Sequence, residues 1–204
     1  MSYSLLFDIG MVIVRFDFAK AAAAVSQHCS LGPEAIFLAV NELKDDLECG
    51  RLSNDAFLDE TIDRIGYTGR RADLLEAFTD VFELNQPMVD LIESEKALGT
   101  PLYLLSNTNG IHVPFLFDQY PVFRLFNDAI YSHEVGCMKP DDSIYEITLE
   151  KLKIDPSRTI YIDDLPENID AGKKHGFVGI RYDGSDHSEF LNQFQQAKAE
   201  LSSL

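Results

Sequence analysis

Three apolar runs in the sequence end in side chains that can bind a ligand or react with it. The first run ends at Asp8, the second at Ser106 and Asn107, and the third at Asp163 and Asp164. For any one of them, a turn residue after a strand is the simpler interpretation. Because ligands bind beyond the carboxyl ends of the strands in open α/β sheets, all of them together predict one site at a shared rim.

Lys139 can bring a positive charge to the same rim, because it lies in the loop after a fourth apolar run, Ala129–Tyr131. Alone it would be a solvated surface lysine. The chain has 17 basic and 34 acidic residues, a formal net charge of −17, so an anionic ligand needs local positive charge to bind. Lys139 therefore predicts a small anion site, while the absence of a Lys/Arg-rich run excludes nucleic acid and anionic membranes as partners.

The shared rim requires parallel strands, and short apolar runs that alternate with helical stretches predict them. The expected strands are Ser4–Phe7, Leu102–Leu105, Ala129–Tyr131, Thr159–Ile162 and Val178–Arg181. This alternation is typical of β-α units that build a doubly wound parallel sheet covered on both faces. We therefore predict an α/β core made of residues 1–16 and 86–204.

A helical insertion is expected between the first two strands, because about 90 residues separate them and one crossover helix needs far fewer. Residues 17–85 read as helical nearly throughout. The expected helices are residues 18–28, residues 33–43, a stretch that starts after Ser53 and ends before Gly66, and residues 70–82. They predict a small all-α module inserted after the first strand.

The cysteines and the N-terminal segment favour a reducing compartment. Cys29, Cys49 and Cys137 are scattered and form no C-x-x-C pair, which favours reduced thiols over a disulfide scaffold or a zinc site. The N-terminal segment has no basic stretch before an apolar one, and no window reaches the ~18 apolar residues of a membrane span. We expect a cytoplasmic protein and make no prediction of its oligomeric state.

The order and spacing of these residues resemble the motifs of the haloacid dehalogenase-like (HAD) hydrolases over essentially the whole chain. Asp8 is similar to the first motif, Ser106 to the second, Lys139 to the third, and Asp163 and Asp164 with Asn168 to the fourth. The helical insertion is similar to the family's small α-helical cap. Within the superfamily, the motif segments look most like bacterial α-glucose-1-phosphate phosphatases and the N-terminal phosphatase domain of epoxide hydrolases.

The resemblance implies a Mg²⁺-dependent phosphatase of small phosphorylated metabolites, including sugar phosphates, that works through an aspartyl-phosphate on Asp8. The implied metal site consists of Asp8, Asp164 and the Gly10 carbonyl, with Asp163 bound directly or through water and Asn168 orienting the ligands from behind. The implied phosphate-binding groups are the Ser106 hydroxyl, the Asn107 backbone N–H and the Lys139 ammonium. Halide displacement needs no Mg²⁺, so the acidic pair favours a phosphatase over a dehalogenase.

Gly10 departs from the family pattern, because the family's usual general acid and base is an Asp at this position. Loss of such a group typically lowers the rate about 10²–10⁴-fold. One hypothesis is that the substrate has a leaving group that needs little protonation, such as an anomeric sugar phosphate or an acyl phosphate. Another is that Asp17 substitutes, although an exposed helix-start residue is the simpler interpretation of that side chain.

Two other functions remain open on the sequence. A mutase-like phosphotransferase fits the same motifs, but its chemistry depends even more on the acid and base missing at Gly10. A catalytically weak binding or regulatory protein that keeps a phosphate and metal site also fits Gly10. The intact set Asp8, Ser106, Lys139 and Asp164 argues against this last reading.

Overall fold

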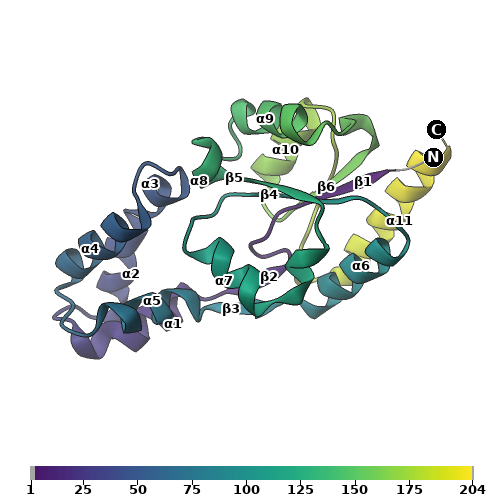
Figure 1. Cartoon of the computed structure of the whole chain (residues 1–204). Helices are drawn as coiled ribbons and strands as arrows, with labels where there is room; N and C mark the ends of the chain where they lie inside the picture. Colours follow the sequence, from purple (N-terminus) through teal and green to yellow (C-terminus); the bar gives the residue numbers. More distant parts are fainter. Residues whose placement is uncertain (1–2, 204) are drawn as a thin grey trace.

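The central sheet has five parallel strands in the order β5-β4-β1-β6-β7 (Figure 1). A computed structural model describes residues 3–203 of the chain. The strands are β1 (Ser4–Phe7), β4 (Leu102–Ser106), β5 (Asp128–Tyr131), β6 (Thr159–Asp163) and β7 (Val178–Arg181). β1 lies between β4 and β6, so Phe7 pairs with Leu104 on one side and Ile162 on the other. The three strand ends that carry polar residues are therefore neighbours, as the sequence predicted.

Helices cover both faces of this sheet, because successive side chains of a strand point to opposite sides. Leu5 and Phe7 lie in one hydrophobic cluster with residues of α6 and α11, and Leu6 lies in a second cluster with residues of α9 and α10. These helices are α6 (Gln86–Ala97), α9 (Asp142–Leu152), α10 (Pro166–Lys174) and α11 (His187–Ser203). The predicted doubly wound α/β fold is confirmed.

Shorter elements complete the connections of the sheet. They are α7 (His112–Gln119), η2 (Pro121–Leu125), α8 (Ser132–Val135) and η3 (Pro156–Arg158). None of the helices found within residues 3–203 is long and apolar enough to cross a membrane.

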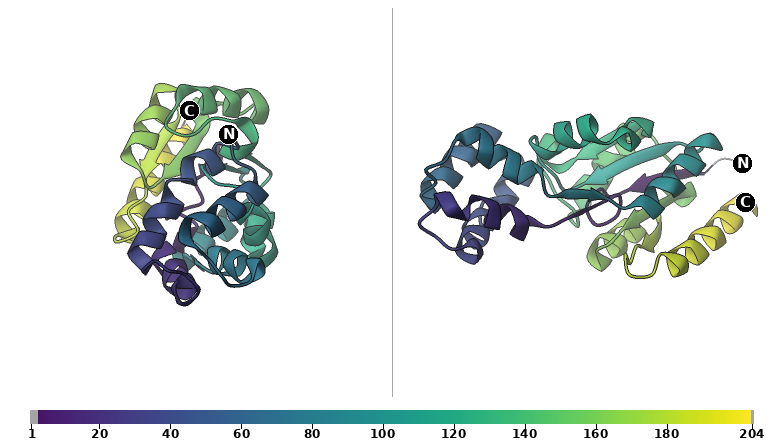
Figure 2. Two further views of the ribbon diagram at one scale, coloured as in Figure 1. Left: turned by 90° about the vertical axis from the view of Figure 1, so that its left-hand side faces the viewer. Right: turned by 90° about the horizontal axis from the view of Figure 1, so that it is seen from below.

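A two-stranded antiparallel ribbon of β2 (Val14–Phe16) and β3 (Phe82–Leu84) leads from the sheet to a separate group of helices (Figures 1 and 2). That group is α1 (Phe18–Val25), η1 (Ser26–His28), α2 (Pro33–Asn41), α3 (Lys44–Glu48), α4 (Asn54–Ile65) and α5 (Arg71–Thr79). Phe82, expected in a helix, pairs with Phe16 in the ribbon. A three-residue strand is too short to show the alternating pattern that would have predicted it.

The helical group has a hydrophobic core of its own. Ile36, Phe57 and Ile65 are buried there, and Ile111 of the main body packs against the same cluster. α4 shows why the sequence forms these helices, because the Ser53 side chain caps its first turn by accepting a hydrogen bond from the Ala56 N–H (3.2 Å). Gly66 ends it with φ of 60°, a left-handed conformation in which glycine is favoured.

Candidate active site

Asp8 lies at the end of β1 in the middle of the sheet edge. Its backbone N–H donates to the Ile162 carbonyl (2.9 Å), which extends the β1–β6 pairing by one residue and fixes where the side chain starts. The residue is 8% exposed, so its carboxylate faces the site with little solvent around it. Burial and the charge of Asp163 raise the pKa of Asp8, while Lys139 and the Ser106 hydroxyl oppose this shift.

Lys139 lies beneath this carboxylate with its side chain almost fully buried (1% exposed). Its ammonium contacts Asp8 Oδ1 at 2.8 Å and Asp163 Oδ2 at 2.7 Å, and donates to the Leu105 carbonyl at 2.9 Å. Burial would lower the pKa of Lys139, but the two carboxylates outweigh it and raise the pKa. All three ammonium protons are used, so Lys139 would exchange one partner to contact a phosphate oxygen.

Asn107 holds the Lys139 loop against the end of β4. Its side-chain amide donates to the Lys139 carbonyl (2.9 Å) and accepts from the Lys139 N–H (2.8 Å). Ser106, the last residue of β4, is 2% exposed. The structure thus brings Ser106 and Lys139 to the side of Asp8. It also shows that the Asn107 side chain holds the Lys139 backbone through two hydrogen bonds, which the sequence did not reveal.

Asp163 accepts four hydrogen bonds, which occupy both carboxylate oxygens. Oδ2 accepts from Lys139 and from the Tyr161 hydroxyl (2.6 Å), and Oδ1 accepts from the Leu165 N–H (2.9 Å) and the Asn168 amide (3.0 Å). Burial alone would raise the pKa of Asp163, but Lys139 and these donors outweigh it and lower the pKa. A carboxylate has about four acceptor positions, so little is left for a direct bond to a metal.

Asp8, Asp163 and Asp164 each place one carboxylate oxygen within 4.8 Å of the others. Burial, followed by the charges of Asp8 and Asp163, raises the pKa of Asp164 to about 6. With Lys139 as counter-charge, three ionised carboxylates leave a net charge of 1 − 3 = −2 in the cluster. A divalent cation fits this charge and this oxygen chemistry.

Asn168 offers a second sign that a cation fits this site. Its amide nitrogen donates to Asp163, whereas its side-chain oxygen is buried and has no hydrogen-bond partner among residues 3–203. Buried polar atoms are almost always paired, and an orphaned oxygen beside an acidic cluster fits a bound cation or its water. Asn168 thus contacts Asp163 directly, and its role in orienting metal ligands stays a prediction.

Gly10 has no side chain, and the ring of Phe16 occupies the adjacent space. A Cβ atom built on Gly10 would lie 3.0 Å from Phe16 Cε1 and 3.9 Å from Asp8 Oδ2. A side chain at this position would therefore lie close to the Asp8 carboxylate, but the Phe16 ring would have to shift to make room for it. Asp17 caps α1 by accepting from the Ala19 N–H (2.9 Å), which agrees with a helix-start role.

Gly10→Asp is expected to raise kcat on phosphate esters of poor leaving groups about 10²-fold, because it restores a carboxyl group close to Asp8. Phe16 is 38% exposed and can turn away, so the double variant with Phe16→Ala should gain at least as much. Steady-state kinetics on an alkyl phosphate measure the effect, with Phe16→Ala alone as control. No gain in either variant, with folding and Mg²⁺ binding intact, would show that another group already performs the proton transfer.

Glu48 is a residue near the site that sequence reasoning missed. It is the last residue of α3, and its side chain is 12% exposed. The next two residues contact the main body. The Cys49 thiol donates to the Gly136 carbonyl (3.2 Å), and Gly50, with φ of 69°, lies against His133. Burial raises the pKa of Glu48 to about 7, and Asp8 and Lys139 are among the charges that act on it. No sequence motif marks such a residue, because only the docking of α3 brings it there.

Glu48→Gln is expected to stabilise the protein at high pH. The pKa of Glu48 rises from 4.5 to about 7 on folding, so its stabilising contribution is complete below about pH 4.5 and is lost as the pH rises through 7. The charges facing it are Lys44 at 3.9 Å, Asp45, Asp8 and Lys139. One pKa unit corresponds to about 1.4 kcal/mol. From pH 4.5 to pH 8.5, the free energy of unfolding of the variant should therefore rise by about 3 kcal/mol relative to that of the wild type.

Urea unfolding with EDTA at both pH values measures this gain, and Glu146→Gln, an exposed change on α9, is the matched control. Parallel pH profiles for the wild type and Glu48→Gln would contradict the buried position of Glu48.

Two phosphatases are similar to this chain in sequence. The chain is 28% identical over 189 residues to the D-ribitol-5-phosphate phosphatase of Bacteroides thetaiotaomicron, covering 87% of this chain and 90% of that protein. It is 26% identical over 141 residues to the sesquiterpene phosphatase astK of Aspergillus oryzae, covering 69% and 72%.

Solved structures show the same fold. A HAD family enzyme from Bacteroides thetaiotaomicron superposes with a TM-score of 0.82 at 21% identity, covering 93% of this chain and 98% of that one. A complex of that enzyme with magnesium and inorganic phosphate superposes with a TM-score of 0.77 at 20% identity, covering 94% and 99%.

A family model also matches the chain. The model of haloacid dehalogenase-like hydrolases matches residues 14–176, a stretch that includes Ser106, Lys139 and Asp163 and begins after Asp8. The chain therefore belongs to the haloacid dehalogenase-like hydrolases.

Proposed function

We propose that the chain is a Mg²⁺-dependent phosphatase of small phosphate monoesters that works through an aspartyl-phosphate on Asp8. The observation that carries the proposal is the position of the Asp8 carboxylate, which is buried, held by Lys139 and grouped with Asp163 and Asp164. Relatives named as phosphatases support the reaction, and the magnesium and phosphate complex of a structural relative supports the ligands.

In this proposal the Asp8 carboxylate attacks the phosphorus atom, the bond from phosphorus to the ester oxygen breaks, and the leaving group departs with the electron pair and takes a proton from water. Ser106 and Lys139 stabilise the transferring group. Lys139 orients Asp8 through its 2.8 Å contact and adds positive charge next to the reacting oxygen. Asn107 keeps Lys139 in place through the backbone of the loop. The resemblance implies that the Asn107 backbone N–H binds the phosphate. Water then hydrolyses the aspartyl-phosphate and restores Asp8.

The metal in this proposal is held by Asp8, Asp164 and the Gly10 carbonyl. When bound, Mg²⁺ neutralises charge on the carboxylates and on the phosphate. Asp163 and Asn168 support the site from behind, since Asp163 already accepts four hydrogen bonds and anchors both Lys139 and Asn168. These four hydrogen bonds favour contact of Asp163 with the metal through water over direct binding.

The helices of residues 17–85 act in this proposal as the cap over the site, and residues 1–16 with 86–204 form the catalytic core. The ribbon of β2 and β3 joins the two parts (Figure 2). Contact between them at Cys49 and Gly136 supports a cap that excludes water when it is closed. A cytoplasmic location agrees with three cysteines that carry no disulfide.

The second candidate is a catalytically weak protein that binds phosphate and metal for regulation, and Gly10 is the observation that favours it. Phe16 fills the space of the missing acid, so the site would turn over slowly on esters of poor leaving groups. A phosphotransferase ranks below both, because its chemistry depends more on that acid.

Release of inorganic phosphate from phenyl phosphate, glucose 1-phosphate and glucose 6-phosphate tests the proposed function. We expect turnover with Mg²⁺, none with EDTA, and recovery when excess Mg²⁺ is restored. Saturable binding of phosphate and Mg²⁺ without release from any ester would instead support the regulatory candidate. A clear preference for glucose 6-phosphate over glucose 1-phosphate would contradict the hypothesis that Gly10 selects esters that need little protonation.

A further inference from the structure

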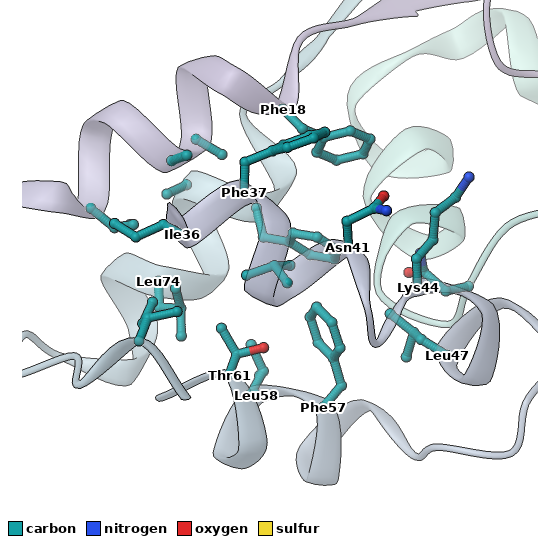
Figure 3. A pocket seen from close by; sticks show the side chains of 18 of the residues that line it. Phe18, Ile36, Phe37, Asn41, Lys44, Leu47, Phe57, Leu58, Thr61 and Leu74 are labelled. Carbon is teal, nitrogen blue, oxygen red and sulfur yellow. The ribbon is translucent and has the colours of Figure 1, made fainter. Parts of the chain in front are cut away.

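The cap helices line a partly open cavity of about 80 Å³ whose walls are mainly apolar side chains (Figure 3). A cavity needs about 10–15 Å³ of such volume to hold one water molecule, so this cavity has room for several heavy atoms. Its walls include Phe18, Ile36, Leu47, Phe57, Leu58 and Leu74. Hydroxyl groups of a sugar or polyol placed against these apolar walls would lose hydrogen bonds, so this part of the lining favours an apolar group.

Three residues link the cavity to the neighbourhood of the acidic cluster. Asn109 and His112 line it from the main body, and Asn109 follows Ser106 by three positions. Glu48 lines it from α3, and Asp8 and Lys139 are among the charges that act on its carboxyl group. These links favour an ester that has its phosphate at Ser106 and its organic part in the cavity.

Thr61 offers a polar contact inside this apolar space. The residue is 2% exposed, it lines the cavity, and its hydroxyl oxygen has no hydrogen-bond partner within the described part of the chain. Figure 3 shows the hydroxyl directed into the space between the helices. A buried hydroxyl without a partner is destabilising, so an occupant with one hydrogen-bonding group would satisfy it.

His112 adds no charge to the cavity. Burial lowers the pKa of His112 to about 4, its Nε2 lies 3.2 Å from the Phe78 carbonyl, and its Nδ1 lies 3.0 Å from the Asn109 amide. The ring is thus a neutral aromatic wall, which stacks on Phe78 at 4.4 Å between centroids. Aromatic walls favour an aromatic occupant.

We propose that this cavity binds the organic part of the substrate and that the substrate is an aryl phosphate whose ring carries one hydrogen-bonding group for Thr61. This proposal rests on the phosphatase function proposed above. The missing side chain at Gly10 supports it independently, because a phenolate leaves without a proton more readily than an alkoxide does. As an Asp8 oxygen bonds to phosphorus, the bond from phosphorus to the aryl oxygen breaks, and the phenolate leaves with the electron pair and takes a proton from water.

Calorimetric titration with phosphonates tests the cavity without any turnover. In the presence of Mg²⁺, phenylphosphonate is expected to bind about 10- to 100-fold tighter than methylphosphonate, because the ring buries apolar surface. Ala77→Leu, which narrows the cavity, should abolish this difference. Ala39→Leu makes the same change at a half-buried cap position outside the cavity lining and should preserve it. Equal affinities of the two phosphonates for the wild type would overturn the proposal.

Thr61→Val tests the polar contact. The variant should melt a few degrees higher, because it removes an unpaired buried hydroxyl, and it should lose the preference of the wild type for 4-hydroxyphenylphosphonate over phenylphosphonate. A wild type without that preference would contradict the role of Thr61. If phenylphosphonate binds tightly but no ester releases phosphate, the cavity proposal is supported and the phosphatase function is rejected. Failure of the cavity proposal can therefore be told apart from failure of the phosphatase proposal.

Discussion

Asp8→Asn is expected to lower kcat on phenyl phosphate about 10⁴- to 10⁶-fold, the scale on which removal of a covalent nucleophile acts. The asparagine oxygen can still accept the Lys139 hydrogen bond, so the geometry at 2.8 Å is preserved while the attacking carboxylate is lost. Stability should not fall, because the substitution removes one of three carboxylates that repel each other in a buried cluster.

Steady-state phosphate release measures the rate, and thermal unfolding verifies the fold. Asp170→Asn, an exposed change on α10, is the matched control and should keep full activity. Turnover within tenfold of the wild type in a folded Asp8→Asn protein would rule out the nucleophile assignment.

Lys139→Met is expected to lower the free energy of unfolding by about 3–5 kcal/mol at pH 7.5, because it leaves Asp8 and Asp163 buried without their shared cation. This is a large part of the 5–15 kcal/mol that typically stabilises a domain. Without Lys139 the pKa of both carboxyls rises, so they protonate as the pH falls and the deficit should shrink towards pH 5. Activity should be lost at every pH.

Urea unfolding at pH 5 and pH 7.5 measures the deficit, and Lys174→Met, an exposed change on α10, serves as the control for the loss of one lysine. A deficit below 1 kcal/mol at pH 7.5 would show that the cluster does not depend on Lys139 for its charge balance.

The sheet and most of its rim were predictable from the sequence because buried parallel strands are short apolar runs. Ser4–Phe7 is one such run, and all five predicted strands form within about one residue of their expected bounds. The residue after the run is fixed by the pairing of the strand, so Asp8 reaches the rim regardless of the details of packing. Ser106 and Asp163 follow the same rule on the neighbouring strands.

Features that depend on contacts between distant segments were not predictable. The ring of Phe16 reaches Gly10 only because the chain turns back after Ile9, whose carbonyl accepts hydrogen bonds from the Ile13 and Val14 N–H groups. Glu48 approaches the site only because α3 docks on the loop before Lys139. The unpaired hydroxyl of Thr61 has no signature in a helical sequence, since threonine in a helix usually bonds its own backbone. Residue type and spacing carry local information, whereas these positions arise from tertiary packing.

Trapping the covalent intermediate tests the central claim most directly. The wild type is mixed with phenyl phosphate and Mg²⁺, quenched in acid within one turnover, and reduced with borohydride, which converts an aspartyl-phosphate to homoserine. Peptide mass spectrometry then locates the modified residue. We expect homoserine at position 8 and nowhere else. Phosphate release with unmodified Asp8 under the same conditions, or homoserine at Asp163 or Asp164 instead, would contradict it.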